Sequence, residues 1–382
     1  KEKINFFKKV LNKVDYIVIS PGININKTKF KSILYKNKKK IITDLDLFYT
    51  QKLPIKSIMI TGTNGKSTTC KLLQHVLRTS KIDALLGGNI GKPVLDLKVR
   101  KNSIVIIEAS SFQLSYLKFA KPTFATILNI TNDHLDWHGT LKNYQDSKFN
   151  IFSKQDYKDK AILGKKDHIK KFKRKYFKSK LIKIQAGSLQ KNFKKNIKNT
   201  YLLSFPNLEN VSFVYKLSII LKIKKNIILK ALNTFKGLPH RNETFYHRNG
   251  IKFVNDSKAT SFDATQHSLN NYKNIFWIVG GLPKLSDKFE LQKVKKNIIK
   301  SYIVGKSANY FKKQISGVLK YKSSLTIEKA LQDIIKDLFL LKKKQATILL
   351  SPASASYDQF KNFVERGNHF KNLTLRYARK IL

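Results

Sequence analysis

The sequence predicts an α/β fold built on mostly parallel sheets, and three features support this prediction. From residue 56 onward, short β-branched segments alternate with amphipathic helical segments, which is typical of a parallel sheet with helices on both faces. Several of the apolar segments end in glycine, carboxylate or histidine residues, as expected where ligands gather at strand ends. The length of 382 residues, with 42% hydrophobic residues, allows two or three domains with substantial cores.

The chain is organised around the segment 56–68, which reads KSIMITGTNGKST. An apolar strand ends at Gly62, a short loop follows, and an amphipathic helix begins near Ser67. Such a strand, glycine loop and helix present backbone N–H groups to a phosphate. In a phosphate loop, Lys66 would reach the β- and γ-phosphates and the Ser67 hydroxyl would hold Mg²⁺. Only two residues separate Gly62 from Gly65, where the usual P-loop has four before its GK pair, and a plain strand-to-helix turn is the alternative.

The first 50 residues contain few predicted elements. The expected elements are a strand over 16–20, a helix-like segment and a short strand over 40–43. This is too little for a domain with a core of its own. We expect that the chain lacks the first strand–helix unit of this region.

The middle of the chain contains a glycine loop and two polar groups that follow predicted strands. A glycine loop is expected over 85–91, with Asn89 near its centre. A buried strand over 103–107 leads to Glu108, and a second over 124–130 leads to His134. Because strand ends of a parallel sheet share one edge, these groups predict Mg²⁺ beside ATP. The alternatives are a surface strand end for the carboxylate and a hydrogen-bonded core residue for the histidine.

A helix is expected over 141–152, and it carries Lys148 between aromatic residues. Considered alone, this lysine resembles any helical lysine whose stem packs on aromatic rings. His138, in the preceding loop, is interpreted as a core histidine rather than a ligand.

A second α/β unit is predicted after a break in periodicity at residues 237–241. Two helices precede this break, within 211–235. The strands expected beyond it cover 251–255, 275–280, 301–304 and 346–351. The expected helices include 261–269, 326–340 and one that begins at Tyr357.

Three strand ends of this second unit carry candidate ligand groups. Asp256 would contact a ribose or Mg²⁺, and Lys258 a carboxylate or phosphate, with a helix N-cap turn as the alternative. Lys284 is a candidate anion ligand or a solvated lysine. The segment 351–356, at a predicted helix N-terminus, suits a carboxylate, although a tight structural turn is the alternative.

Composition limits the class of protein. A single cysteine excludes a disulfide framework and fits a cytoplasmic setting. No segment is long and apolar enough to span a bilayer. The 76 Lys and Arg residues against 24 Asp and Glu suggest nucleic-acid binding, but the lysines are spread along the whole chain. A solvated surface therefore explains them better than a specific nucleic-acid partner.

Taken together, these motifs resemble the Mur ligase family, in particular its glutamate-adding members. The motifs follow the family order over nearly the whole chain. TGTNGK is shared with sister ligases and with folylpolyglutamate synthase, whereas EASSFQL and DQFKNFVERG are specific to fewer proteins and point to the glutamate-adding members. They are SPGI (20–23), TGTNGKST (61–68), GGNIG (87–91), EASSFQL (108–114), LNITNDHLD (128–136), YQDSKFNIF (144–152), GLPHR (237–241), NDSKAT (255–260) and SPASASYDQFKNFVERGNHF (351–370).

The resemblance implies three domains: a partial UDP-binding domain (1–50), a central ATPase domain (51–236) and a Rossmann-like C-terminal domain (237–382). It implies that ATP phosphorylates the carboxylate of UDP-N-acetylmuramoyl-L-alanine, and that D-glutamate attacks the acyl phosphate. The expected protein is a cytoplasmic monomer that makes a peptidoglycan precursor and uses ATP and two Mg²⁺ ions.

The resemblance also implies roles for individual residues. Metal ligands would be Ser67, Glu108, His134 and Lys148, the lysine as N6-carboxylysine. Lys66, Glu108, His134 and Lys148 would form the catalytic group. The ATP site would contain Gly62, Thr63, Asn64, Gly65, Lys66, Ser67, Thr68, Asn210, Arg241 and Asp256. The sites for the sugar substrate and for glutamate would contain Ser20, Pro21, Gly22, Asn89, Ser110, Gln113, Lys258, Thr260, Lys284, Ser356 and Phe363.

One family pattern is altered. The second asparagine of its central HNxxN motif is Phe213 here, which weakens one expected ATP contact. Two other functions remain alternatives at this point: a ligase that resembles folylpolyglutamate synthase, and a basic nucleic-acid-binding NTPase.

Overall fold

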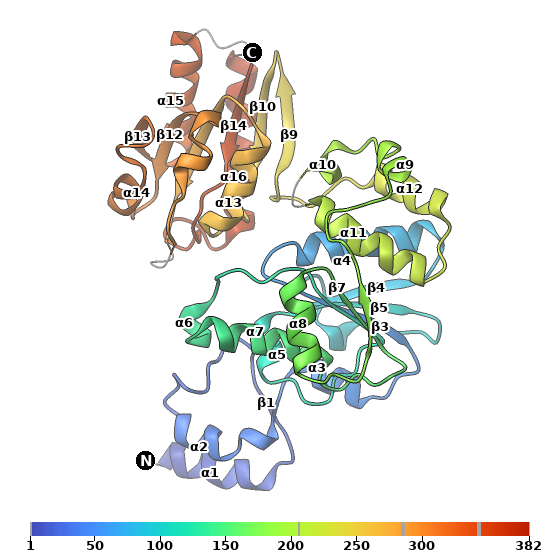
Figure 1. Ribbon diagram of the computed structural model, residues 1–382. Helices are drawn as coiled ribbons and strands as arrows, with labels where there is room; N and C mark the ends of the chain where they lie inside the picture. The colour runs from blue at the N-terminus through green and yellow to red at the C-terminus, as the bar shows by residue number, and fades with distance from the viewer. Residues whose placement is uncertain (1, 205–206, 284–286, 342–344, 382) are drawn as a thin grey trace. The chain divides into compact units, whose positions relative to one another are not determined.

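The computed structural model describes residues 2–204, 207–283, 287–341 and 345–381. The chain divides into two compact units, Lys1–Phe235 and Lys236–Leu382, and each contains a six-stranded sheet (Figure 1). The predicted α/β fold is therefore confirmed in both units. The division into three domains at residues 50 and 236 stays a prediction.

The sheet of the first unit is entirely parallel, in the order β4-β5-β3-β6-β7-β8. The carboxyl ends of all six strands therefore lie at one edge. The strands are β3 (Lys56–Thr61), β4 (Ala84–Gly88), β5 (Ile104–Glu108), β6 (Phe124–Ile127), β7 (Lys160–Leu163) and β8 (Lys180–Lys183).

Helices cover both faces of this sheet, because its strands are apolar on both sides. In β3, Ile58 and Ile60 belong to one core, with α4, α11 and α12, whereas Met59 belongs to the other, with α3, α5, α7 and α8. Successive side chains of a strand point to opposite faces. The helices are α3 (Asp44–Thr50), α4 (Lys66–Thr79), α5 (Ser111–Ser115), α6 (Leu135–His138), α7 (Leu141–Phe149), α8 (Lys166–Arg174), α9 (Lys191–Lys195), α10 (Thr200–Leu203), α11 (Asn207–Ile220) and α12 (Lys225–Thr234).

The N-terminal segment of this unit forms a small layer of its own. It contains α1 (Glu2–Lys13), β1 (Ile17–Val18), α2 (Lys31–Lys36) and β2 (Ile41–Ile42), and the two short strands pair in parallel. Its apolar cluster is completed by Tyr116, which follows α5. The Tyr116 hydroxyl donates to Ile23 O at 3.0 Å and accepts from Ile25 N at 3.2 Å. This layer thus depends on the larger sheet for part of its core, as its small size requires.

The sheet of the second unit has the order β13-β12-β11-β14-β10-β9, and only β9 runs antiparallel. Two apolar cores lie on its faces, one with α15 and α16 and one with α13 and α14. The elements are β9 (Glu243–Arg248), β10 (Ile251–Asn255), α13 (Phe262–Asn271), β11 (Ile275–Gly280), β12 (Ile298–Val304), α14 (Ala308–Ile315), β13 (Tyr321–Leu325), α15 (Ile327–Leu340), β14 (Ala346–Leu350) and α16 (Phe363–Ile381).

Two local predictions are wrong. The expected glycine loop over 85–91 is largely strand β4, which pairs with β5. Gly88 has φ +100°, and a Cβ there would lie 2.4 Å from Glu108 O, so its glycine allows close strand contact rather than a loop. The last helix begins at Phe363 and not at Tyr357, because the Asn362 side chain accepts from Val364 N and Glu365 N and caps it.

In the part of the chain that the structure describes, no helix has the length and apolar character needed to cross a membrane.

His138 joins α5 to α7 inside the first unit, as expected for a core histidine. The ring is buried, and its Nε2 and Nδ1 lie 3.0 Å and 3.4 Å from the hydroxyls of Ser111 and Ser147. Burial is the main cause that lowers the pKa of His138 to about 4, and the neighbouring His134 and Lys148 lower it further.

This histidine predicts a pH-dependent stability. Since the folded pKa lies below the ordinary 6.5, the unfolded chain binds more protons, and the contribution is lost as pH falls from 6.5 toward 4. The wild type should lose on the order of 1–2 kcal/mol more than His138→Gln between pH 7 and pH 5. Urea unfolding at both pH values measures this difference. Replacement of the exposed His247 serves as the control, and an equal loss in wild type and His138→Gln would contradict the prediction.

Candidate active site

The loop between β3 and α4 has the shape that the motif predicts. Gly65 precedes α4 with φ +83°, and a Cβ there would lie 2.2 Å from Asn210 Oδ1 on α11. Both the positive φ and this close approach require glycine. Asn210, which the family resemblance assigns to the ATP site, therefore lies against the loop.

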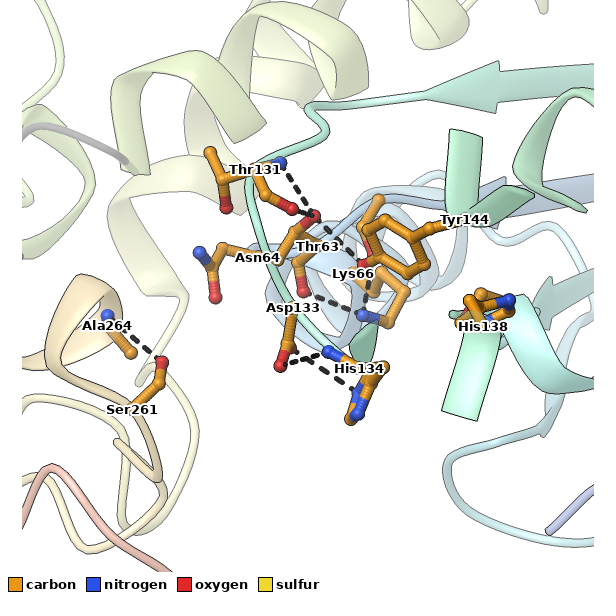
Figure 2. Close-up of polar contacts among 12 residues, drawn as sticks. Thr63, Asn64, Lys66, Thr131, Asp133, His134, His138, Tyr144, Ser261 and Ala264 are labelled. Carbon is orange, nitrogen blue, oxygen red and sulfur yellow. Dashed lines mark hydrogen bonds and ion pairs between the residues drawn. The ribbon is translucent and has the colours of Figure 1, made fainter. Parts of the chain in front are cut away.

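A lysine ammonium group lies inside this loop, as Figure 2 shows. Lys66 Nζ donates to Gly62 O at 2.7 Å and to Thr63 O at 2.8 Å. Ser67 and Thr68 follow in the first turn of α4, and both are buried. A cation together with the N-terminus of a 14-residue helix favours an anion at this position.

Asn129, which follows β6, and Tyr144, on α7, both form hydrogen bonds with the loop, and sequence reasoning missed both residues. The Thr63 hydroxyl accepts from Thr131 N at 3.0 Å and shares a hydrogen bond with the Tyr144 hydroxyl, also at 3.0 Å (Figure 2). Asn64 N donates to Asn129 Oδ1 at 2.9 Å. The motifs LNITNDHLD and YQDSKFNIF contain Asn129 and Tyr144, but nothing in their spacing predicts these contacts.

The side chain of Lys148 contacts the same loop. The residues around Lys148 in the sequence do not by themselves predict this contact. Its side chain is 1% exposed, and Nζ donates to Gly62 O at 2.9 Å. Nζ also lies 4.5 Å from the centre of the Tyr144 ring. Burial, followed by the charge of Lys66, lowers the pKa of Lys148 well below its usual value. A larger share of this amine is therefore neutral and nucleophilic than in an exposed lysine.

Glu108 ends strand β5, next to β3 in the sheet. The residue is 2% exposed, and Oε1 accepts from Asn89 Nδ2 at 2.9 Å. Oε2 is buried and has no hydrogen-bond partner among the described residues. A buried carboxylate oxygen without a protein partner is costly, and a cation bound there would compensate it.

His134 lies beyond the end of β6, with φ +53°. Its Nε2 is 3.4 Å from Asp133 Oδ2, and its ring packs against Phe112 at 4.8 Å and Tyr144 at 6.4 Å. Tyr144 thus contacts both His134 and the loop.

The donor set at this edge is mixed. The described residues contain no group of three or more His, Cys, Asp or Glu side chains placed to hold a metal ion. One carboxylate, one imidazole and one hydroxyl would leave other coordination positions of Mg²⁺ to phosphate oxygens and water, as this ion prefers. The unpartnered Oε2 of Glu108 is the feature that best fits Mg²⁺ here.

The other predicted residues of the first unit already have protein partners. Ser110 and Gln113 form a capping box at α5, and Gln113 Nε2 donates to Asp44 Oδ1 at 3.1 Å. The segment Ser20–Pro21–Gly22 turns after β1, and Gly22 O accepts from Trp137 Nε1 at 3.3 Å. Their roles in substrate binding stay predictions.

The second unit gathers another group of polar residues at the ends of β10 and β14. Asp256 is buried and accepts from Asn242 N and from the hydroxyls of Ser268 and Ser351. Burial raises its pKa to about 6, although these hydrogen bonds and nearby Arg241 oppose the rise. Asp256 thus joins three parts of the unit, which spacing did not predict, and its role toward ATP stays a prediction.

Lys258 contacts two residues from other segments of the second unit. Its Nζ lies 4.1 Å from the centre of the Phe363 ring, and its backbone N donates to His240 O. Thr260 follows on the same loop, and Ser356 is buried after β14. The predicted anion ligand Lys284 lies outside the described residues.

Arg366 is the residue of the second unit that sequence reasoning missed. It is 2% exposed and donates to Ser257 O at 2.8 Å and to Ser354 O at 2.9 Å. It therefore joins the loops after β10 and β14.

Phe213 has a structural role. It is fully buried in the core that contains α4 and α11. The effect of this altered HNxxN motif on ATP binding stays a prediction.

Sequence comparison identifies the family. The Mur ligase middle domain matches residues 60–227. The chain is 33% identical over 394 residues to the UDP-N-acetylmuramoylalanine–D-glutamate ligase of Rickettsia felis, covering 96% of this chain and 86% of that protein. The chain belongs to the Mur ligase family. This Mur ligase is also 34% identical over 382 residues to the ligase of the same name from Rickettsia bellii, covering 94% of this chain and 84% of the other.

Solved structures support the fold of this Mur ligase. The MurF ligase of Thermotoga maritima, in complex with ADP, matches with a TM-score of 0.64 at 16% identity, covering 97% of both chains. At this identity the likeness shows the fold alone. The resemblance that the motifs suggested, and the Mur ligase fold that it implied, are both confirmed.

Proposed function

We propose that this Mur ligase joins D-glutamate to UDP-N-acetylmuramoyl-L-alanine and converts ATP to ADP and phosphate. The product is a peptidoglycan precursor, and the reaction takes place in the cytoplasm. The single observation that carries the proposal is the pair of lysines on one carbonyl: Lys66 and Lys148 both donate to Gly62 O, at 2.7 Å and 2.9 Å. The names of the relatives from two Rickettsia species support the choice of substrates.

ATP activates the carboxylate of the sugar substrate in this reaction. A carboxylate is a poor electrophile, because its oxygen is a poor leaving group. Transfer of the γ-phosphoryl group to the alanyl carboxylate of the sugar substrate forms an acyl phosphate and releases ADP. The glutamate amine then attacks the carbonyl carbon, a tetrahedral intermediate forms, and phosphate leaves as the amide bond is completed. The amine loses a proton in the process.

The phosphate-loop residues would hold ATP during the first step. Lys66 would leave the carbonyls of Gly62 and Thr63 and bind the β- and γ-phosphates, where its charge offsets the charge that builds up during transfer. The backbone of 62–68 would hold the phosphates at the N-terminus of α4. Asn210, which lies against Gly65, would contact the same nucleotide, together with Arg241 and Asp256.

Two Mg²⁺ ions would neutralise phosphate charge at this edge of the sheet. Ser67, Glu108 and His134 would hold them, and the unpartnered Oε2 of Glu108 supports this assignment. Lys148 would contribute as N6-carboxylysine. Its neutral amine would attack CO₂, form an N–C bond and release a proton, so that the side chain becomes a carbamate with carboxylate-like oxygen ligands.

The remaining predicted residues would bind the two other substrates. The nucleotide sugar would contact Ser20, Pro21 and Gly22, and its carboxylate would lie near Asn89, Ser110 and Gln113. Glutamate would bind to residues of the second unit, namely Lys258, Thr260, Lys284, Ser356 and Phe363. We expect the ligase to be a monomer.

Phosphate release tests the proposed function. The protein is mixed with ATP, UDP-N-acetylmuramoyl-L-alanine and D-glutamate, and each is omitted in turn. Sustained release should require all three. Release that is indifferent to glutamate would overturn the proposal, whereas turnover of a folate with L-glutamate would favour the folylpolyglutamate-type alternative.

A further inference from the structure

We propose that Asn129 is a positioning residue that sets the shape of the phosphate loop. The inference rests on the proposed binding of ATP by that loop. Asn129 follows β6 by two residues and is partly buried. It contacts the loop with both its backbone and its side chain.

Asn129 forms hydrogen bonds with both residues that separate Gly62 from Gly65, namely Thr63 and Asn64. Asn129 O accepts from Thr63 N at 2.9 Å. Its side-chain Oδ1 accepts from Asn64 N at 2.9 Å, and its Nδ2 donates to Asn64 O at 3.3 Å. The side chain thus pairs with the N–H and C=O of Asn64 as a neighbouring strand would.

The start of the loop is fitted to the same segment. A Cβ at Gly62 would lie 3.1 Å from Leu128 Cβ and 3.4 Å from Asn129 N. The β3–β6 ladder also continues to this point, since Leu128 N donates to Thr61 O at 2.9 Å. The start of the loop therefore packs closely against the backbone of residues 128–129, which limits its conformation.

The backbone of residues 128–129 continues directly into the segment that carries His134. Thr131 N donates to the Thr63 hydroxyl at 3.0 Å, three residues before the imidazole. The position of the loop and the position of His134 are therefore fixed by one short stretch of backbone. Catalysis needs phosphate-binding groups that are already in place before negative charge develops in the transition state. Asn129 would hold the phosphate loop in that arrangement.

The consequence is a selective effect on nucleotides with a β-phosphate. A side-chain truncation at residue 129 removes two hydrogen bonds to Asn64 and loosens the loop. ADP has a phosphate within reach of Lys66, whereas AMP lacks it. Asn129→Ala should therefore weaken ADP binding about tenfold and leave AMP binding nearly unchanged. The KM for ATP should rise, with little change in the KM for glutamate.

Isothermal titration with ADP, and competition with AMP, test this prediction in the full chain with Mg²⁺ present. Asn132→Ala, at an exposed position of the same segment, is the matched control and should bind both nucleotides like the wild type. Asn129→Asp keeps an acceptor for Asn64 N but places an anion near the phosphates. It should bind ADP at least as weakly as the alanine variant.

Unchanged ADP affinity in Asn129→Ala would overturn the inference, and so would an equal loss for ADP and AMP. If the alanine variant does not fold, Asn129→Ser, whose neutral and shorter side chain also lacks the amide that pairs with Asn64, provides the same comparison. A wild-type protein that does not bind ADP would instead overturn the proposed function, so the two failures can be told apart.

Discussion

Lys148→Ala should lower ligase turnover by at least about a thousandfold. The substitution removes a group that donates to Gly62 O at 2.9 Å and lies at the phosphate loop. If the lysine is carboxylated, it also removes an oxygen ligand of Mg²⁺. Steady-state phosphate release measures the loss, and the exposed Lys142 on the same helix provides the control variant.

A chemical rescue separates these two roles of Lys148. Acetate or a similar short carboxylate would occupy the space left by the side chain and replace the missing oxygen ligand. Partial recovery of turnover in Lys148→Ala, and none in the wild type, is expected. Undiminished turnover of the variant without any additive would refute the role of the carboxylated lysine.

Gly65→Ala should lower kcat/KM for ATP about a hundredfold, for two additive reasons. The residue has φ +83°, which costs any non-glycine residue energy, and the new Cβ would lie 2.2 Å from Asn210 Oδ1. Either the loop or Asn210 must move. Both would contact ATP, so the loss should appear in nucleotide binding and in turnover.

Gly187→Ala isolates the backbone strain from the clash. Gly187 has φ +80°, and no atom lies within 4 Å of an added Cβ. Its substitution should leave kcat/KM for ATP within about threefold of the wild type, with a small loss of stability. Equal activities of Gly65→Ala and Gly187→Ala would contradict the prediction, because neither the strain nor the contact with Asn210 at Gly65 would then lower the activity.

The phosphate loop is the part of the site that the sequence predicts best. A strand, glycines and a helix with Lys66 at its start are local features, and local spacing determines them. The same is true of β10 and β11, whose predicted bounds of 251–255 and 275–280 agree with the structure. The continuous apolar run of β11 fits a strand that is buried on both faces.

Contacts between distant segments could not be predicted in this way. Lys148 looks ordinary on its helix, and only the fold brings its amine to Gly62 O, 86 residues away in sequence. Asn129 and Tyr144 reach the loop for the same reason. The predicted glycine loop at 85–91 failed because β4 uses Gly88 to approach Glu108 O, a contact that depends on strand pairing.

Acidic residues illustrate a second limit. Their scarcity makes those within motifs conspicuous, but it does not distinguish ligands from structural groups. Glu108 has an unpartnered oxygen at the edge of the sheet. Asp256, by contrast, accepts hydrogen bonds from three residues inside the second unit. Only the folded structure distinguishes these two environments.

Oxygen transfer tests the chemistry at the centre of this account. UDP-N-acetylmuramoyl-L-alanine labelled with ¹⁸O in its alanyl carboxylate is incubated with the protein, ATP, Mg²⁺ and D-glutamate, and the released phosphate is analysed by mass spectrometry. An acyl phosphate requires that one carboxylate oxygen leave with phosphorus, so each phosphate released should carry one ¹⁸O. Phosphate without the label, formed while the amide product accumulates, would contradict it.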